Sequence, residues 1–188
     1  MGVTTLICCI AKLENNYIRE WVEWYKGIGV TNICLYDNND IDGETFNEVI
    51  DDYIESGFVI IENVRGTEGM QLPCYQHCYD KYKDKYQWIG FFDADEYMEI
   101  ERGDISDFLS MQEWNNVGAI RLCWKNYDDS NLLKVIDNNY SIKRFTTLVN
   151  PDDICNRISK VIVRGGGGYQ NISKTRWRPR AVFKLHNR

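Results

Sequence analysis

No hydrophobic run in the 188-residue sequence approaches the ~20 residues that a membrane-spanning helix requires. Proline occurs only three times, and no low-complexity linker interrupts a chain that is 44% hydrophobic and 13% aromatic. This composition excludes a disordered protein and is compatible with one domain that buries a core. Residues 1–17 have no basic region before their apolar run, which ends at Lys12, so we interpret them as a buried strand and not as a signal peptide. We therefore expect a cytoplasmic protein, with at most peripheral association with the inner face of a membrane.

Histidine occurs only twice, which leaves few ligands for a zinc site. Cys74, His77 and Cys78 can share one helical face, but a fourth ligand at suitable spacing is missing, and packing is the favoured interpretation. The sequence has seven cysteines and lacks an export signal. An odd number of thiols without export predicts reduced cysteines that mainly fill the core.

Basic residues are scarce in the first part of the chain. Residues 1–142 contain 11 Lys and Arg against 26 Asp and Glu, whereas residues 143–188 contain 11 basic and 2 acidic side chains. The basic segment would suit nucleic acid, a phosphate-bearing ligand held by the acidic part, or a solvated face paired with that part. The last two interpretations are equally favoured, and no nucleic-acid partner is expected.

Apolar runs of strand length alternate with segments of helical periodicity from residue 4 to about residue 92. Strands are expected at 4–11, 31–39, 58–64 and 88–92, and helices at 14–30, 44–57 and 72–86. This alternation predicts an α/β fold with a mostly parallel central sheet and helices on both faces. Further along, we expect a helix at 105–114 and strands at 118–127 and 158–164. For Gly165–Gly168 a turn is favoured over a phosphate cradle.

The segment WIGFFDADEYMEI, residues 88–100, runs an apolar strand directly into three carboxylates. Uninterrupted apolarity predicts a strand buried on both faces, and ligands of open α/β sheets gather at the carboxyl ends of such strands. In an extended chain, Asp93 and Asp95 point to the same side, where they would bind Mg²⁺ or Mn²⁺ carrying a diphosphate. The alternative is a strand end whose acidic residues are simply hydrated.

A second acidic stretch, NNDIDGE, follows the expected strand at 31–39. It resembles a calcium-binding EF-hand loop, but position 12 is Val49 where a bidentate Glu is required, so this interpretation is rejected. Asp37 and Asn39 lie at the same sheet edge as Asp93, where they would read a nucleotide base. Ordinary turn and helix-capping chemistry is the alternative.

The order of these segments resembles that of glycosyltransferases of the GT-A fold, closest to the family 2 and family 92 enzymes of capsular and lipopolysaccharide synthesis. The resemblance covers residues 4 to about 100 well and the remainder more thinly. The matching residues are Lys12, Glu20, Trp21, Gly29, Val30, Asp37, Asn38, Trp88, Ile89, Asp93, Asp95 and Glu96.

The resemblance implies a metal-dependent transferase that uses a nucleotide diphosphate sugar, with a UDP-sugar preferred, and a glycan or lipid-linked acceptor of surface polysaccharide. Asp93 would contact the ribose or the metal, Asp95 would ligate Mn²⁺ or Mg²⁺, and Asp37 would lie near the uracil. The backbone of Ala11 and Lys12 would line the same pocket. Residues 1–188 would form one GT-A-like domain, with a nucleotide-sugar half at 1–100 and a short acceptor half at 101–188.

Three further residues are candidates in the C-terminal half. His186 would complete the metal shell, although a tail histidine without a role is an equal alternative. An inverting mechanism needs a carboxylate base near the acceptor hydroxyl, and Asp128 and Asp129 are the first candidates, with a polar turn as the alternative.

Two other functions remain open. One is a nucleotide-sugar-binding module without turnover. The other, less favoured, is a haloacid-dehalogenase-type phosphatase, which also places Asp-x-Asp after an apolar strand. In such phosphatases the motif lies near the N-terminus, whereas here about three strand–helix units precede it.

Overall fold

The computed structural model of the chain describes residues 2–128, 147–148, 159–167 and 184–187. The helices among these residues are α1 (Ile18–Gly27), α2 (Asn47–Glu55), α3 (Gln71–Tyr82), α4 (Ile105–Leu109) and the 3-10 helix η1 (Gln112–Trp114). The strands are β1 (Thr5–Ala11), β2 (Asn32–Asp37), β3 (Val59–Asn63), β4 (Trp88–Phe91), β5 (Glu96–Met98), β6 (Ala119–Asp128), β7 (Thr147–Leu148), β8 (Ser159–Arg164) and β9 (Lys184–Asn187).

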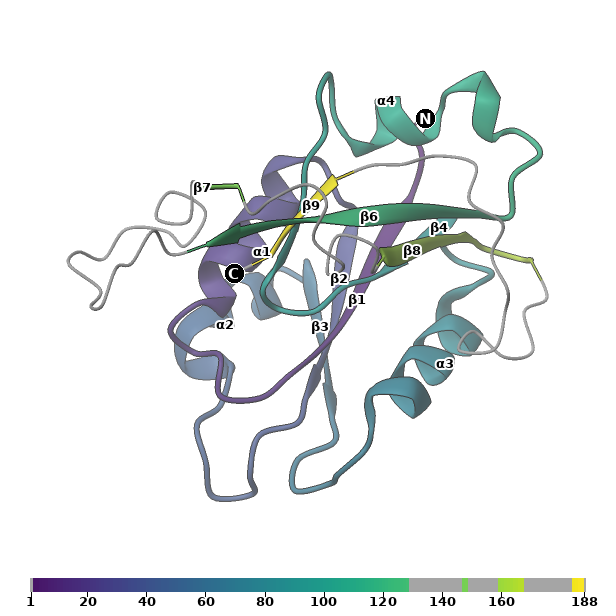
Figure 1. The fold of residues 1–188 in the computed structure, drawn as a ribbon. Helices are drawn as coiled ribbons and strands as arrows, with labels where there is room; N and C mark the ends of the chain where they lie inside the picture. The colour runs from purple at the N-terminus through teal and green to yellow at the C-terminus, as the bar shows by residue number, and fades with distance from the viewer. Residues whose placement is uncertain (1, 129–146, 149–158, 168–183, 188) are drawn as a thin grey trace.

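The strands form one sheet in the order β3-β2-β1-β4-β8-β6-β9-β5, with β7 paired to β6 (Figure 1). The first four strands along the chain are parallel, because each is joined to the next by a crossover that contains a helix. The second half adds antiparallel pairs around β8 and β6. The predicted α/β fold is therefore confirmed, and β4 lies between β1 and β8 as its uninterrupted apolarity indicated.

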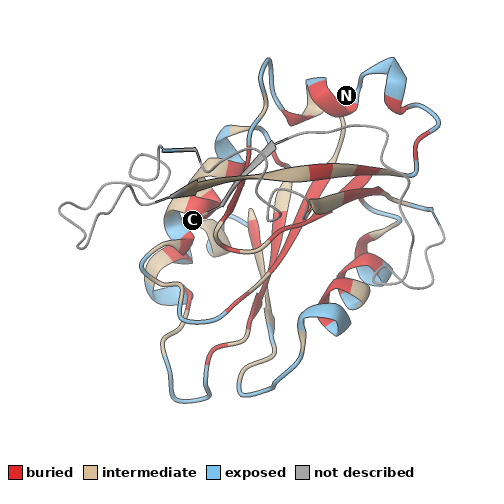
Figure 2. Ribbon diagram, viewed as in Figure 1, coloured by how far each residue is buried: buried red, intermediate tan, exposed pale blue. Residues whose placement is uncertain are grey.

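Alternating side chains of β1 enter two cores on opposite faces of the sheet. Ile7 and Cys9 pack in the core that contains α1, whereas Leu6 and Cys8 pack in the core that contains α3. This is the period of two expected of a strand covered on both sides. Buried residues accordingly run along the central strands and along the inner faces of the helices (Figure 2).

The predicted helix at 105–114 is interrupted in the structure. Helix α4 begins at a capping box, in which Asp104 and Asp107 each accept the other's backbone N–H. It ends at Leu109, and Met111 has the extended ψ of 141° before η1 begins. Strands β5, β7 and β9 were not expected from the sequence, because each is only two to four residues long.

Gly165 and Gly90 are required by close packing. A Cβ atom at Gly165 would collide with the carbonyl oxygen of Tyr86, and at Gly90 it would lie 2.6 Å from the Phe92 ring. Gly165 follows Arg164, which pairs with Trp88 at the beginning of β4. The described glycines of this turn therefore lie at the opposite end of β4 from Asp93, which argues against a phosphate cradle there.

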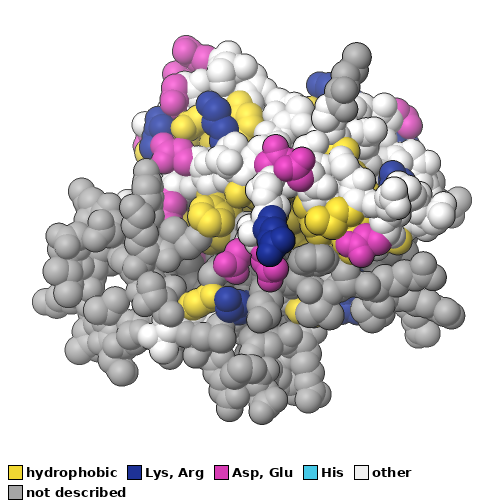
Figure 3. Space-filling view, turned by 90° about the horizontal axis from the view of Figure 1, so that it is seen from above, with side chains coloured by type: hydrophobic (Ala, Val, Ile, Leu, Met, Phe, Trp, Pro, Cys, Tyr) yellow, Lys and Arg dark blue, Asp and Glu magenta, His cyan; other side chains and the backbone are white. Residues whose placement is uncertain are grey.

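The described surface carries mixed charge. On the face shown in Figure 3, acidic and basic side chains are interspersed, and neither sign gathers into an extended patch. Most of the basic residues predicted to matter in 143–188 lie outside the described residues. None of the helices that the structure describes has both the length and the apolar character needed to cross a bilayer.

Candidate active site at the carboxyl edge of the sheet

Three predicted site residues, Ala11, Asp37 and Asp93, lie at the same edge of the sheet, where parallel strands end. Ala11 and Asp37 are paired at the ends of β1 and β2, and the N–H of Asn38 donates to the Ala11 carbonyl over 3.0 Å. Beyond the next strand, the N–H of Phe92 donates to the Cys8 carbonyl, which extends the β1–β4 pairing to the residue before Asp93. The carboxyl ends of β1, β2 and β4 thus form one edge, as the sequence predicted.

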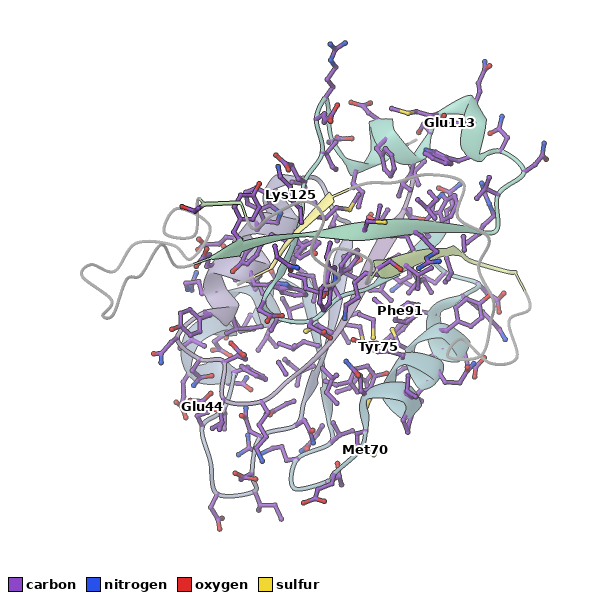
Figure 4. The ribbon with its side chains drawn as sticks, viewed as in Figure 1. Glu44, Met70, Tyr75, Phe91, Glu113 and Lys125 are labelled. Atoms are coloured by element: carbon purple, nitrogen blue, oxygen red, sulfur yellow. The ribbon has the colours of Figure 1, made fainter. Side chains whose placement is uncertain are left out.

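Asp93 is held by three donors. Its Oδ1 accepts hydrogen bonds from Gln71 Nε2 and Tyr75 Oη, each over 3.0 Å, and its Oδ2 forms an ion pair with Lys160 Nζ at 2.5 Å. Tyr75 is itself positioned by Phe91, whose ring centroid lies 5.0 Å away (Figure 4). Helix α3 and strand β8 therefore fix the orientation of this carboxylate, which is 34% exposed.

Glu96 is fully buried beneath Asp93. Its backbone carbonyl accepts from Trp21 Nε1 over 2.9 Å and from Tyr25 Oη over 3.1 Å, which ties β5 to α1. Its Oε2 accepts the Asp93 N–H over 2.9 Å and lies 3.2 Å from Lys160 Nζ. No ligand role was predicted for Glu96, and hydration was the alternative for the acidic residues of this strand end, whereas the structure shows a buried side chain that anchors the turn.

Burial raises the pKa of Glu96 to about 8, although Lys160 acts in the opposite direction. Its Oε1 is buried and has no hydrogen-bond partner among the described residues. Burial also lowers the pKa of Lys160, but the charges of Glu96 and Asp93 outweigh this effect and raise it overall. The site therefore brings the carboxyl groups of Asp93 and Glu96 to a single ammonium group, and Glu96 retains its proton to a higher pH than an exposed glutamate does.

Asp37 forms a buried ion pair that the sequence did not reveal. Its Oδ2 lies 2.9 Å from Arg65, and its Oδ1 accepts the N–H of Asn39 over 3.0 Å. The Arg65 guanidinium also donates to four backbone carbonyls of the loop after β2, those of Asp40, Ile41, Gly43 and Glu44. Asp37 and Arg65 therefore hold the loop that borders the predicted nucleotide pocket.

Asn39 and Lys12 join the loop after β1 to the loop after β2. Asn39 is fully buried, and its Oδ1 accepts the N–H of Leu13 over 2.7 Å. Leu13 has a φ of 58°, a conformation unusual for a non-glycine residue, and this hydrogen bond helps to hold it. Lys12 is half-exposed and pairs with Asp40 at 2.7 Å. Both predicted residues thus lie in the two loops that follow the parallel strands β1 and β2.

A zinc site at Cys74, His77 and Cys78 is not formed. Both cysteines are buried in the core under α3, and His77 Nδ1 lies 2.6 Å from Tyr36 Oη. Within the described ranges, no three His, Cys, Asp or Glu side chains are grouped in a way that would hold a metal ion. Packing, the favoured interpretation of these residues, agrees with the structure.

The family model of glycosyltransferase family 92 matches residues 4–188. The chain belongs to glycosyltransferase family 92. A family 92 protein of Ricinus communis is 26% identical over 184 residues, which cover 89% of this chain and 33% of that protein. One from Arabidopsis thaliana is 27% identical over 166 residues, covering 80% of this chain and 28% of the relative. The chain thus spans about a third of the length of these family 92 relatives.

Among solved structures, this family 92 chain is similar to the crystal structure of S. aureus TarS 1–349 in complex with UDP. The TM-score is 0.50 at 11% identity, and the match covers 72% of this chain and 38% of TarS. At this identity the likeness shows the fold alone. It supports the GT-A-like α/β architecture predicted from the order of strands and helices.

The divalent cation expected for this family 92 chain has no preformed cage among the described residues. Magnesium in particular is often bound by one or two carboxylates, with substrate phosphates and water completing its shell. Asp95 lies in the turn between β4 and β5 and is partly buried. Burial first, then the charges of Asp93, Glu96 and Asp95, raise the pKa of the nearby Cys9 thiol. Oxygen donors on one turn fit an ion that arrives with a diphosphate.

For the C-terminal candidates His186 and Asp128, the structure describes the backbone only. His186 lies in β9, opposite Tyr97 of β5, so the backbone brings its strand next to the acidic turn. Asp128 is the last residue of β6 and pairs with Thr147. It lies six positions beyond Leu122, the β6 partner of Lys160, which is roughly 20 Å along an extended strand. Asp129 lies outside the described residues, as do the side chains of Asp128 and His186.

Sequence reasoning did not single out Lys160, Arg65 or Tyr75. One signal was present for Lys160, because it is the only charged residue between Ser159 and Val163 in an apolar strand. Arg65 and Tyr75 carried no comparable signal. Arg65 contacts Asp37 from 28 positions away in the sequence, and Tyr75 contacts Asp93 from 18 positions away.

Proposed function

We propose that this chain carries the donor-binding part of a glycosyltransferase that uses a nucleotide diphosphate sugar, a UDP-sugar by preference. Donor binding takes place at the edge formed by the carboxyl ends of β1, β2 and β4. The acceptor is a glycan or a lipid-linked sugar of surface polysaccharide. Family 92 membership and the fold shared with TarS, which was crystallised with UDP, support this proposal.

The observation that carries the proposal is the convergence of charge at this edge. Asp93 and Glu96 meet Lys160 at 2.5 and 3.2 Å, and Asp95 lies on the same turn. Parallel α/β sheets bind ligands at this position. The Asp37–Arg65 pair supports the loop on the neighbouring strand, where the base would lie.

Transfer breaks the bond between the anomeric carbon and a diphosphate oxygen, while an acceptor hydroxyl attacks that carbon. Asp95, with Asp93, is proposed to hold Mn²⁺ or Mg²⁺, which when bound stabilises the negative charge of the diphosphate. His186 is retained as a third proposed ligand. In an inverting reaction a carboxylate accepts the proton of the attacking hydroxyl. Asp128 and Asp129 stay predictions for this role, and Asp128 lies roughly 20 Å along β6 from the partner of Lys160.

Calorimetric titration with UDP, with MnCl₂ or with EDTA, tests the proposal. We expect Mn²⁺ to strengthen UDP binding, and Asp95→Asn to remove that gain, at least about tenfold in affinity, without lowering the melting temperature. Glu99→Gln is the matched control, because Glu99 follows on the same segment and pairs with Lys125 at 3.7 Å, away from Lys160. It should bind UDP as the unaltered chain does.

Unchanged Mn²⁺-dependent affinity in Asp95→Asn would contradict the metal role of Asp95. UDP binding without hydrolysis or transfer of any UDP-sugar would instead favour a nucleotide-sugar-binding module. The phosphatase alternative gains no support from family 92. It predicts hydrolysis of a simple aryl phosphate, which we expect the chain not to catalyse.

A further inference from the structure

Lys160 occupies the position at which a cation is expected. Its Nζ contacts Asp93 at 2.5 Å and Glu96 at 3.2 Å, and its side chain is only 14% exposed. Within the described part of the chain, it is the only Lys or Arg that forms an ion pair with either carboxylate. Its strand, β8, lies beside β4, so the ammonium group is delivered to the carboxyl end of that strand.

Lys160 is shared between two carboxyl groups. Asp93 and Glu96 both lie within ion-pair distance of its Nζ, and Oε1 of Glu96 is buried without a hydrogen-bond partner in the described residues. A diphosphate brought to this turn is repelled by the carboxylates unless a cation moves between them. A lysine has three donors on a flexible stem, so its ammonium group can contact a carboxylate and a phosphate together.

We propose that Lys160 is a diphosphate-binding residue, which Asp93 and Glu96 hold in place when no donor is bound. This inference rests on the proposed function, and it adds a cationic contact that belongs to the protein itself. With the donor bound, Lys160 keeps its contact with Asp93 and donates hydrogen bonds to the diphosphate. When the sugar–oxygen bond breaks, the electron pair stays on the diphosphate oxygen, and the ammonium group stabilises that charge without transferring a proton.

The competing explanation is that Lys160 only neutralises buried Glu96. The two explanations differ for the double variant Glu96→Gln/Lys160→Met. If neutralisation is the whole role, removing both charges restores binding. If Lys160 contacts the diphosphate, the double variant still lacks that contact and binds UDP weakly.

The test compares UDP with uridine, which lacks the diphosphate, by calorimetry in EDTA and in MnCl₂. We expect the unaltered chain to bind UDP more tightly than uridine even in EDTA. Lys160→Met should lose at least about tenfold in UDP affinity while its uridine affinity stays within about twofold. Lys160→Arg should recover part of the loss. Lys81→Met is the matched control. Lys81 lies near the C-terminal end of α3 and forms an ion pair of the same 2.5 Å length with Glu62 of β3, away from the acidic turn.

Thermal unfolding of each variant shows whether the variant is still folded. The double variant controls for the effect of leaving Glu96 without its Lys160 partner. Equal UDP affinity in Lys160→Met and the unaltered chain, or restored affinity in the double variant, would overturn the inference but leave the proposed function standing. If the unaltered chain binds neither UDP nor a UDP-sugar, with or without Mn²⁺, both proposals are wrong.

Discussion

Glu96 has no exposed surface, although it belongs to the most acidic turn of the chain. Its carbonyl is held by Trp21 and Tyr25, and its carboxyl group lies against Lys160. The backbone at Glu96 is therefore fixed from α1, and the N–H of Asp93 is fixed by the Glu96 side chain. Glu96 belongs by sequence to the acidic motif, but its buried side chain holds the backbone of that motif in place.

The raised pKa of Glu96 predicts a specific dependence of stability on pH. Burial raises the pKa from 4.5 to about 8, so between these values the folded chain retains a proton that the unfolded chain has lost. The contribution of Glu96 to stability is therefore highest at low pH and falls as pH rises, by up to ~1.4 kcal/mol per pH unit. We expect Glu96→Gln to flatten the decline in unfolding free energy between about pH 5 and 8.

Urea unfolding in EDTA, followed by tryptophan fluorescence across this range, measures the effect. Glu99→Gln is again the control, because the Glu99 side chain is 43% exposed and should leave the decline unchanged. A Glu96→Gln variant with the same pH dependence as the unaltered chain would show that Glu96 does not retain its proton on folding.

At the scale of elements, the loop between β2 and α2 depends on one side chain from beyond β3. Arg65 joins Asp37 to four loop carbonyls, and its side chain is only 13% exposed. A planar guanidinium presents several donors in fixed directions, which an ammonium group cannot reproduce. The loop between Asp37 and α2 is therefore ordered by tertiary contacts as well as by its turn residues.

Arg65→Lys keeps the charge and removes this geometry. We expect a loss of ~1–3 kcal/mol in unfolding free energy, because several loop carbonyls lose their donor. Affinity for UDP should fall as well, since the loop borders the proposed base pocket. Chemical denaturation and calorimetry measure the two effects.

Arg19→Lys is the matched control for this change. Arg19 forms exposed ion pairs with Glu23 and Asp52, at 3.3 and 2.6 Å, and such pairs contribute little. We expect its substitution to change stability by less than ~0.5 kcal/mol. A similar small change in Arg65→Lys would show that the loop is ordered without the guanidinium.

At the scale of the whole molecule, the sheet separates two hydrophobic cores, and both contain buried cysteines. Buried thiols among the described residues are Cys8, Cys9, Cys34, Cys74 and Cys78. Burial raises the pKa of Cys8 and of Cys74 to about 11 in each case. A thiol with such a pKa is roughly 0.1% thiolate at pH 8, and burial also denies it contact with reagents.

We therefore expect the buried thiols to react only when the chain unfolds. The experiment uses a Cys123→Ser/Cys155→Ser background, because Cys123 is partly exposed and Cys155 lies outside the described residues. Dithionitrobenzoate at pH 8 should label the native background protein at least about 100-fold more slowly than the unfolded protein. Rapid labelling of the native form would contradict the closed packing of the two cores.

The sequence by itself determined the regular elements of the first half and the edge of the sheet at which the parallel strands end. Local periodicity is enough for this, since the apolar patterns of β1, α1 and β4 each reflect only neighbouring positions. The same reasoning located Asp37 and Asp93 at strand ends, and the structure places both at one edge. The same reasoning predicted one helix at 105–114 where the structure has two, α4 and η1. Met111 between them is extended, but no proline or glycine at that position signals the break.

The tertiary structure alone decided which charges meet. Lys160 reaches Asp93 across 67 positions of sequence, and Trp21 reaches the carbonyl of Glu96 across 75. Strand β9 joins the sheet beside β5 through pairings that no local pattern encodes. Contacts of this kind depend on how strands are ordered in the sheet, and a side chain's role in the site follows from burial and from the charge opposite it. Both are properties of the folded chain, which is why the carboxylates could be read from the sequence and their partners could not.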